Sequence, residues 1–122
     1  MKPARAPAIL VVEDEPLVAL DIVDCVEEAG YQVVGPVATL EDALQKATSG
    51  TFDAALVDAN LGGYRVDRVA AALARRRIPF AFVTGYGRET LPEGFRHVEV
   101  VAKPYTHQQL IAVIKNLISQ HN

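Results

Sequence analysis

The stretch AILVVEDEP, residues 8–16, decides the fold of this chain of 122 residues. Its first five residues form an unbroken apolar run, which is typical of a β-strand buried on both faces. The run stops at three acidic residues, 13–15, and Pro16 suits the first turn of a helix. The stretch therefore predicts a buried strand that ends in acidic side chains and leads directly into a helix.

The same strand-then-helix unit recurs along the chain. Apolar runs predict further strands over residues 32–37, 53–58, 79–84 and 98–102. Apolar residues at helical spacing predict helices over residues 16–29, 40–47, 66–73 and 107–118. Between Gly85 and His97, glycines and prolines leave room only for a helix that is short, frayed or absent.

Strands that alternate with helices over short connections imply right-handed crossovers and a parallel sheet. The predicted fold class is α/β, a doubly wound five-stranded parallel sheet with helices on both faces. Ligands of such sheets bind beyond the carboxyl ends of the strands. We therefore expect the functional residues at those ends.

Length and composition limit the classes of function. The chain fits one domain, since domains run to roughly 100–200 residues, and we expect residues 1–7 to be an N-terminal tail and residues 8–122 a single domain. The net charge of −3 disfavours nucleic acid as a partner. No apolar run approaches the ~20 residues of a membrane span. The expectation is a cytoplasmic protein without membrane contact.

Three carboxylates are expected at neighbouring strand ends: Glu13, Asp14 and Asp58. Carboxylates that close repel one another unless a cation lies among them. A site of oxygen ligands with few protein carboxylates suits Mg²⁺, which keeps several waters and phosphate oxygens in its coordination shell. The sequence therefore predicts a Mg²⁺ site.

Thr84 ends one further predicted strand and Lys103 follows another, and they add a hydroxyl and a positive charge. Together with the carboxylates and Mg²⁺ they would surround a phosphoryl group in transfer, whose oxygens need neutralising. Asp58 ends the central strand of the set, and an aspartate carboxylate can attack phosphorus to form an acyl phosphate. We interpret Asp58 as the nucleophile.

These residues resemble the receiver domains of two-component response regulators, with a flavodoxin-like or CheY-like (βα)5 fold. The likeness rests on Val-Val-Glu13-Asp14, Leu-Val-Asp58, Val-Thr84-Gly85 and Val-Ala-Lys103-Pro104, and it runs from Ile9 to about Ser119.

The resemblance implies that Asp58 accepts a phosphoryl group from a histidine kinase. Asp14, Asp58 and the Asn60 carbonyl would bind Mg²⁺, with Glu13 acting through water. Thr84 and Lys103 would hold the phosphoryl oxygens, and the Lys103–Pro104 bond would be cis. A receiver is a phosphoacceptor and not a conventional enzyme, because it catalyses only its own phosphorylation and dephosphorylation.

The segment Pro79-Phe-Ala-Phe-Val-Thr-Gly-Tyr86 is similar to the Pro-Phe-x-Phe-Ala-Thr-Gly-Gly/Tyr motif of a receiver subgroup. That subgroup is typically paired with histidine kinases of the HWE or HisKA2 type, and its fourth-helix region is often flexible. The resemblance implies a stand-alone receiver, without an output domain, that signals through protein contacts.

Val100 departs from the family pattern, because many receivers carry a switching Tyr or Phe at this position. We therefore expect phosphorylation to draw the Thr84 hydroxyl inward and to order residues 85–94, without rotation of an aromatic ring. Asn60 and Tyr86, each two residues past a site residue, would tune the lifetime of the phosphate.

Several alternatives stay open at this stage. The chain could be a phosphorelay intermediate that passes the group to a histidine phosphotransferase, or a phosphate sink. A small metal-dependent phosphatase and a scaffold with a vestigial site are less favoured. The protein could be a monomer or a weak dimer that depends on phosphorylation. The run Arg75-Arg76-Arg77 is interpreted as a solvated helix end.

Overall fold

A computed structural model describes residues 6–62, 64–85, 91–95 and 97–121. None of the helices in these ranges is long and apolar enough to cross a membrane. The strands are β1 (Ala8–Val12), β2 (Gln32–Val37), β3 (Ala54–Asp58), β4 (Asn60–Leu61), β5 (Tyr64–Arg65), β6 (Phe80–Thr84) and β7 (Glu99–Ala102). The helices are α1 (Pro16–Glu28), α2 (Leu40–Ser49), α3 (Asp67–Arg75) and α4 (His107–His121).

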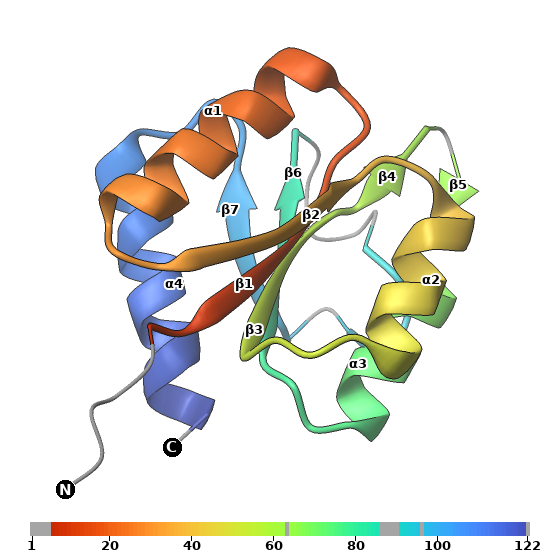
Figure 1. Cartoon of the computed structure of the whole chain (residues 1–122). Helices are drawn as coiled ribbons and strands as arrows, with labels where there is room; N and C mark the ends of the chain where they lie inside the picture. Colours follow the sequence, from red (N-terminus) through yellow and green to blue (C-terminus); the bar gives the residue numbers. More distant parts are fainter. Residues whose placement is uncertain (1–5, 63, 86–90, 96, 122) are drawn as a thin grey trace, which may run out of the picture.

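The main sheet has five parallel strands in the order β2-β1-β3-β6-β7. Helices α1 and α4 cover one of its faces, and α2 and α3 cover the other (Figure 1). The predicted fold class, a doubly wound α/β sheet, is confirmed. β1 and β3 lie in the middle of the sheet, and all five residues of each are buried, as an uninterrupted apolar run predicts.

Alternate residues of each strand point to opposite faces of the sheet and belong to two separate hydrophobic cores. Leu10, Val57 and Phe82 pack toward α2 and α3, whereas Ile9, Leu56 and Val83 pack toward α1 and α4. Because both faces of the sheet are covered, the carboxyl edge of its strands is where polar side chains gather.

Strand register brings the predicted site residues to one edge. Val12 pairs with Val57, so Glu13 and Asp58 come next on adjacent strands. Thr84 pairs with Ala102, and the Lys103 amide donates to the Thr84 carbonyl at 2.8 Å. The hydrogen bonds between strands therefore place Glu13 beside Asp58, and Thr84 beside Lys103.

A β-bulge between β1 and β2 shifts the pairing between Leu10 and Val12. Gly35 lies in this bulge with φ 98°, and the Gly35–Pro36 bond is cis, as is the Lys103–Pro104 bond that the family resemblance implied. Beyond the bulge the Glu13 amide donates to the Val37 carbonyl at 3.0 Å. The bulge therefore determines the position of Glu13, the acidic residue that follows β1, relative to β2.

Two parts of the chain differ from the sequence prediction. Between β3 and α3, where the sequence predicts no strand, lies the short antiparallel pair β4 and β5. Between β6 and β7 the described residues 91–95, 97 and 98 contain turns and no helix, while Leu91 is 2% exposed and belongs to the core on the α2 and α3 face. Residues 86–90, which include Tyr86 and make up half of the segment 85–94 expected to become ordered, lie outside the described residues.

Residues 75–77 are exposed at the end of α3, as expected, but Arg76 has a further role. Its guanidinium donates to the carbonyls of Ala47 and Gly50 at 2.9 and 2.7 Å, and it lies 5.6 Å from the ring centroid of Phe52. Arg76 thus caps the end of α2, which composition and helix position could not reveal.

Replacement of Gly35 by alanine should destabilise the fold much more than replacement of Gly30. Both glycines have positive φ, 98° and 94°, so alanine at either costs about 1 kcal/mol of backbone strain. A Cβ at Gly35 would also lie 2.8 Å from the Val37 nitrogen and 2.9 Å from the Val11 oxygen, whereas a Cβ at Gly30 meets nothing within 4 Å.

Urea unfolding of the two variants checks this expectation. Gly35→Ala should lose about 1–3 kcal/mol more than Gly30→Ala, since the clash is with backbone that cannot relax cheaply. Equal losses would show that the bulge is free to adjust.

Candidate functional site

Three acidic side chains meet at the carboxyl edge of the sheet. Glu13, Asp14 and Asp58 each offer a carboxylate oxygen, and the three oxygens lie within 4.8 Å of one another. Glu13 is 1% exposed and Asp58 is 6% exposed, while Asp14 is half-buried. At that separation two charges repel by about 3 kcal/mol at an effective dielectric constant of about 20. A bare cluster of this kind is electrostatically costly.

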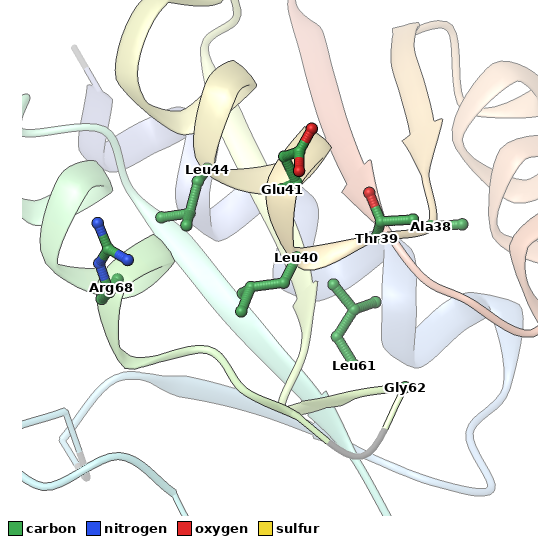
Figure 2. A pocket seen from close by; sticks show the side chains of 8 residues that line it. All are labelled: Ala38, Thr39, Leu40, Glu41, Leu44, Leu61, Gly62 and Arg68. Atoms are coloured by element: carbon green, nitrogen blue, oxygen red, sulfur yellow. The ribbon is translucent and has the colours of Figure 1, made fainter.

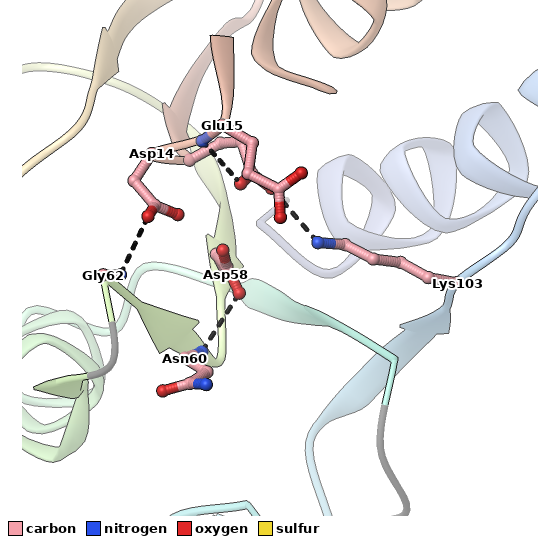
Figure 3. A network of polar contacts seen from close by, with 7 residues as sticks. Asp14, Glu15, Asp58, Asn60, Gly62 and Lys103 are labelled. Carbon is pink, nitrogen blue, oxygen red and sulfur yellow. Dashed lines mark hydrogen bonds and ion pairs between the residues drawn. The ribbon is translucent and has the colours of Figure 1, made fainter. Parts of the chain in front are cut away.

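Backbone N–H groups hold all three carboxylates in place (Figure 3). The Asn60 amide donates to Oδ1 of Asp58 at 3.0 Å, and the Gly62 amide donates to Oδ2 of Asp14 at 3.1 Å. The Glu15 amide donates to Oε2 of Glu13 at 3.2 Å. These donors stabilise the charged carboxylates without filling the space among them.

Glu13 is the most perturbed acid of the cluster. Burial raises its pKa from 4.5 to about 7, and the neighbouring Asp58 carboxylate adds to the rise. The Lys103 ammonium acts in the opposite direction, with Nζ 3.6 Å from Oε1 of Glu13. That buried Oε1 has no hydrogen-bond partner within the described part of the chain.

A cavity of about 280 Å³ opens above the carboxylates. Thr84, Lys103 and Asp58 line it together, so residues that carry a hydroxyl, an ammonium and a carboxylate surround the same space. Thr84 is 3% exposed, and Lys103 is partly buried. The remaining lining residues are Asp14, Glu15, Asn60, Gly62 and Gly85.

The donor set fits Mg²⁺. All candidate ligand atoms are oxygens, which a hard divalent cation prefers. Glu13, Asp14 and Asp58 would hold the ion between them, and Oε1 of Glu13, which accepts no hydrogen bond from the described residues, could accept one from a water of its shell. A bound cation would also remove the repulsion within the cluster.

Of the predicted site residues that the structure describes, it gathers six at the site and places one, Val100, elsewhere. Asp14, Asp58, Asn60, Thr84 and Lys103 line the cavity, and Glu13 lies beneath it against Lys103. Val100 is paired with Phe82 in the sheet and packs into the core. Tyr86 lies outside the described residues.

Sequence reasoning missed Glu15, Gly62 and Gly85 as parts of the site. Glu15 and Gly62 contribute backbone N–H groups, which any residue type supplies, so the sequence holds no direct signal for them. The glycine pair at residues 62 and 63 was the one available hint, because it allows a tight turn.

Comparisons with known proteins agree with this geometry. Residues 9–115 match the response regulator receiver domain family. The phyllosphere-induced regulator PhyR of Methylorubrum extorquens is 31% identical over 93% of this chain and 44% of its own length. The transcriptional regulatory protein PdtaR of Mycobacterium tuberculosis is 27% identical over 92% of this chain and 57% of its own. The chain thus spans about half the length of these curated relatives.

Solved structures give the same result. SdrG from Sphingomonas melonis Fr1 is 39% identical with a TM-score of 0.80, over 93% of this chain and 97% of that one. A BeF3-activated conformation of SdrG is also known. The receiver domain of the sensor histidine kinase PA1611 from Pseudomonas aeruginosa PAO1, which has a magnesium ion in its active site cleft, shares the fold at 24% identity and a TM-score of 0.78, over 94% of this chain and 99% of that one.

Mg²⁺ should stabilise the protein through this cluster. At a hundred times its dissociation constant, the ion should raise the free energy of unfolding by about 2.7 kcal/mol if it binds only the native state. Asp14→Asn should lose the response, because one carboxylate is gone although an oxygen remains to accept from Gly62. Asp24→Asn, on the exposed face of α1, is the control and should respond normally.

Urea unfolding with and without MgCl₂ measures the effect. An unfolding free energy that is indifferent to Mg²⁺ in the unaltered protein would count against the metal site.

Stability without metal should fall as pH rises from about 4.5 to about 7. The pKa of Glu13 is higher in the folded protein than its ordinary value, so the folded state binds the extra proton and loses that advantage as the group ionises. The slope for one proton is at most about 1.4 kcal/mol per pH unit.

Unfolding in chelator across this pH range tests the assignment. Glu13→Gln should flatten the profile between pH 4.5 and 7, and so should saturating Mg²⁺. A Glu13→Gln profile as steep as that of the unaltered protein would contradict it.

Proposed function

Because the chain belongs to the response regulator receiver domain family, we propose that it accepts a phosphoryl group on Asp58 from a histidine kinase in a Mg²⁺-dependent reaction. The observation that carries the proposal is the convergence of Asp58, Thr84 and Lys103 on one polar cavity beside the acidic cluster. Such a protein is a phosphoacceptor and not a conventional enzyme.

Asp58 is the proposed nucleophile because of its position in the cavity. One of its carboxylate oxygens would attack phosphorus and form an O–P bond, while the P–N bond of the donor phosphohistidine breaks and the imidazole nitrogen keeps the electron pair. The Asn60 amide on Oδ1 keeps the Asp58 side chain oriented. The product is a mixed anhydride, which is labile to water.

Lys103 and Thr84 would stabilise the transferred group. The Lys103 ammonium neutralises negative charge that gathers on the phosphoryl oxygens, and the Thr84 hydroxyl can donate a hydrogen bond to one of them. In the structure Lys103 is paired with Glu13 at 3.6 Å. Phosphorylation would therefore draw the ammonium from Glu13 toward the new phosphoryl group.

Mg²⁺ would hold the phosphoryl oxygens and offset the charge of the carboxylates. The proposed ligands are Asp14, Asp58 and the Asn60 carbonyl, with Glu13 acting through water. The magnesium ion in the PA1611 receiver domain supports this choice of metal.

The proposed partner is a sensor histidine kinase of the HWE or HisKA2 type. The motif of residues 79–86, which is similar to that of receivers typically paired with such kinases, supports this choice. We propose that the domain acts as a stand-alone receiver, as the resemblance of residues 79–86 to the subgroup motif implies. A phosphorelay intermediate, which passes the group to a histidine phosphotransferase, or a phosphate sink would use the same chemistry.

Signal output is proposed to start at Thr84. Val100 occupies the position of the usual aromatic switch and is paired with Phe82 in the sheet, so no ring can rotate there. A shift of the Thr84 hydroxyl toward phosphate would instead act on the chain that follows Gly85. The BeF3-activated conformation of SdrG shows that a related receiver takes up an activated state.

Incubation with acetyl phosphate and Mg²⁺ tests the proposal. Intact-protein mass should show one added phosphoryl group, which Asp58→Asn and chelator should abolish. Asp24→Asn should be phosphorylated normally, because this residue is exposed on α1.

Lys103→Gln should slow the reaction by about 10²-fold or more, as expected on removal of a charge that stabilises the transition state. No added mass within times short enough to trap an acyl phosphate would favour a vestigial scaffold.

A further inference from the structure

A second cavity lies beside the phosphoryl site, between the N-terminal ends of α2 and α3 (Figure 2). We call it the α2–α3 groove. Its volume is about 530 Å³, larger than that of the polar cavity. It is lined by Ala38, Thr39, Leu40, Glu41, Leu44, Leu61, Gly62 and Arg68.

The interior of the groove is apolar. Leu61 is buried at its floor, and Leu40 and Leu44 are half-buried on the α2 side. Figure 2 shows the three leucine side chains facing the same space. A concave apolar surface with a few polar groups at its edge is the usual form of a small-molecule site.

Two residues of opposite charge, Glu41 and Arg68, lie at the rim of the groove, and the helix dipoles affect them differently. Glu41 is in the first turn of α2, where the helix dipole stabilises an anion. Arg68 is in the first turn of α3, where the dipole disfavours a cation. Neither residue has an ion-pair or hydrogen-bond partner within the described ranges. An anionic ligand would therefore offset the unfavourable interaction of the Arg68 charge with the helix dipole. A cationic ligand would gain less at Glu41, because the helix dipole already stabilises that charge.

We propose that the α2–α3 groove binds a small carboxylate with an apolar body, such as a medium-chain fatty acid. The hydrocarbon part would pack among Leu40, Leu44 and Leu61, and the carboxylate would accept hydrogen bonds from the Arg68 guanidinium, whose planar fork matches it. The binding itself does not depend on the proposed phosphorylation.

The groove and the acidic cluster share one structural link. Gly62 lines both cavities, and its amide holds Oδ2 of Asp14 at 3.1 Å. A ligand against Leu61 and Gly62 would fix Gly62, which directly follows β4, in the position that orients Asp14. Since coupling between two sites is reciprocal, such a ligand strengthens Mg²⁺ binding, and Mg²⁺ strengthens binding of the ligand to the same extent. This second step rests on the proposed metal site.

Octanoate, used below its micelle concentration, is the probe. Titration of the full chain, followed by the amide NMR signals of Leu61 and Gly62, should show saturable shifts. Octan-1-ol, with the same body and no charge, and acetate, with the charge and no body, should bind several-fold more weakly. Arg68→Gln should weaken octanoate binding by about fivefold, the upper range for an exposed ion pair, while Arg75→Gln at the other end of α3 should not.

Three results would overturn the site: no saturable shift with octanoate, equal binding of octan-1-ol, or equal effects of Arg68→Gln and Arg75→Gln. A Mg²⁺ dissociation constant unchanged by saturating octanoate would overturn the coupling alone. Phosphorylation of the same samples by acetyl phosphate separates these outcomes from failure of the proposed function, because it requires Asp58 and not the groove.

Discussion

The crowding of three carboxylates within 4.8 Å is the constraint on which the rest of the structure depends. A fold that places Glu13, Asp14 and Asp58 together must offset their repulsion, and it does so in several ways. Backbone amides donate to each carboxylate, Lys103 lies against Glu13, and burial favours the protonated form of Glu13. The remaining oxygen capacity points to a divalent cation. The same charges that repel one another prepare the site for a metal and a phosphoryl group.

The parallel sheet creates this crowding through its register. The carboxyl ends of neighbouring parallel strands lie side by side. The position of an acidic residue therefore depends on where its strand stops pairing with the next strand. The bulge at Gly35 adjusts β1 against β2, and the Glu13 amide then bonds to Val37. Arg76 and Phe52 stabilise the C-terminal end of α2.

The sequence predicted the sheet, most element boundaries and the side chains around the polar cavity, because buried strands are unbroken apolar runs and their reactive ends follow directly. It missed features that depend on tertiary contact. No pattern of residue types predicts the β4 and β5 pair or the cap that Arg76 provides. The same holds for the amides of Glu15 and Gly62, which any residue type could supply. Leu91 joins the core from a segment whose glycines and prolines indicated only irregular structure. The α2–α3 groove likewise arises from residues distant in sequence that patterns on single elements cannot bring together.

Identification of the phosphorylated residue tests the central claim most directly. After a short reaction with acetyl phosphate and Mg²⁺, borohydride reduction converts an aspartyl phosphate to homoserine, and peptide mass spectrometry locates it. The account predicts homoserine at position 58 and at no other acidic residue, with none formed in chelator. Modification at Asp14 or Glu13, or modification independent of Mg²⁺, would contradict the assignment of Asp58 as the acceptor beside a metal site.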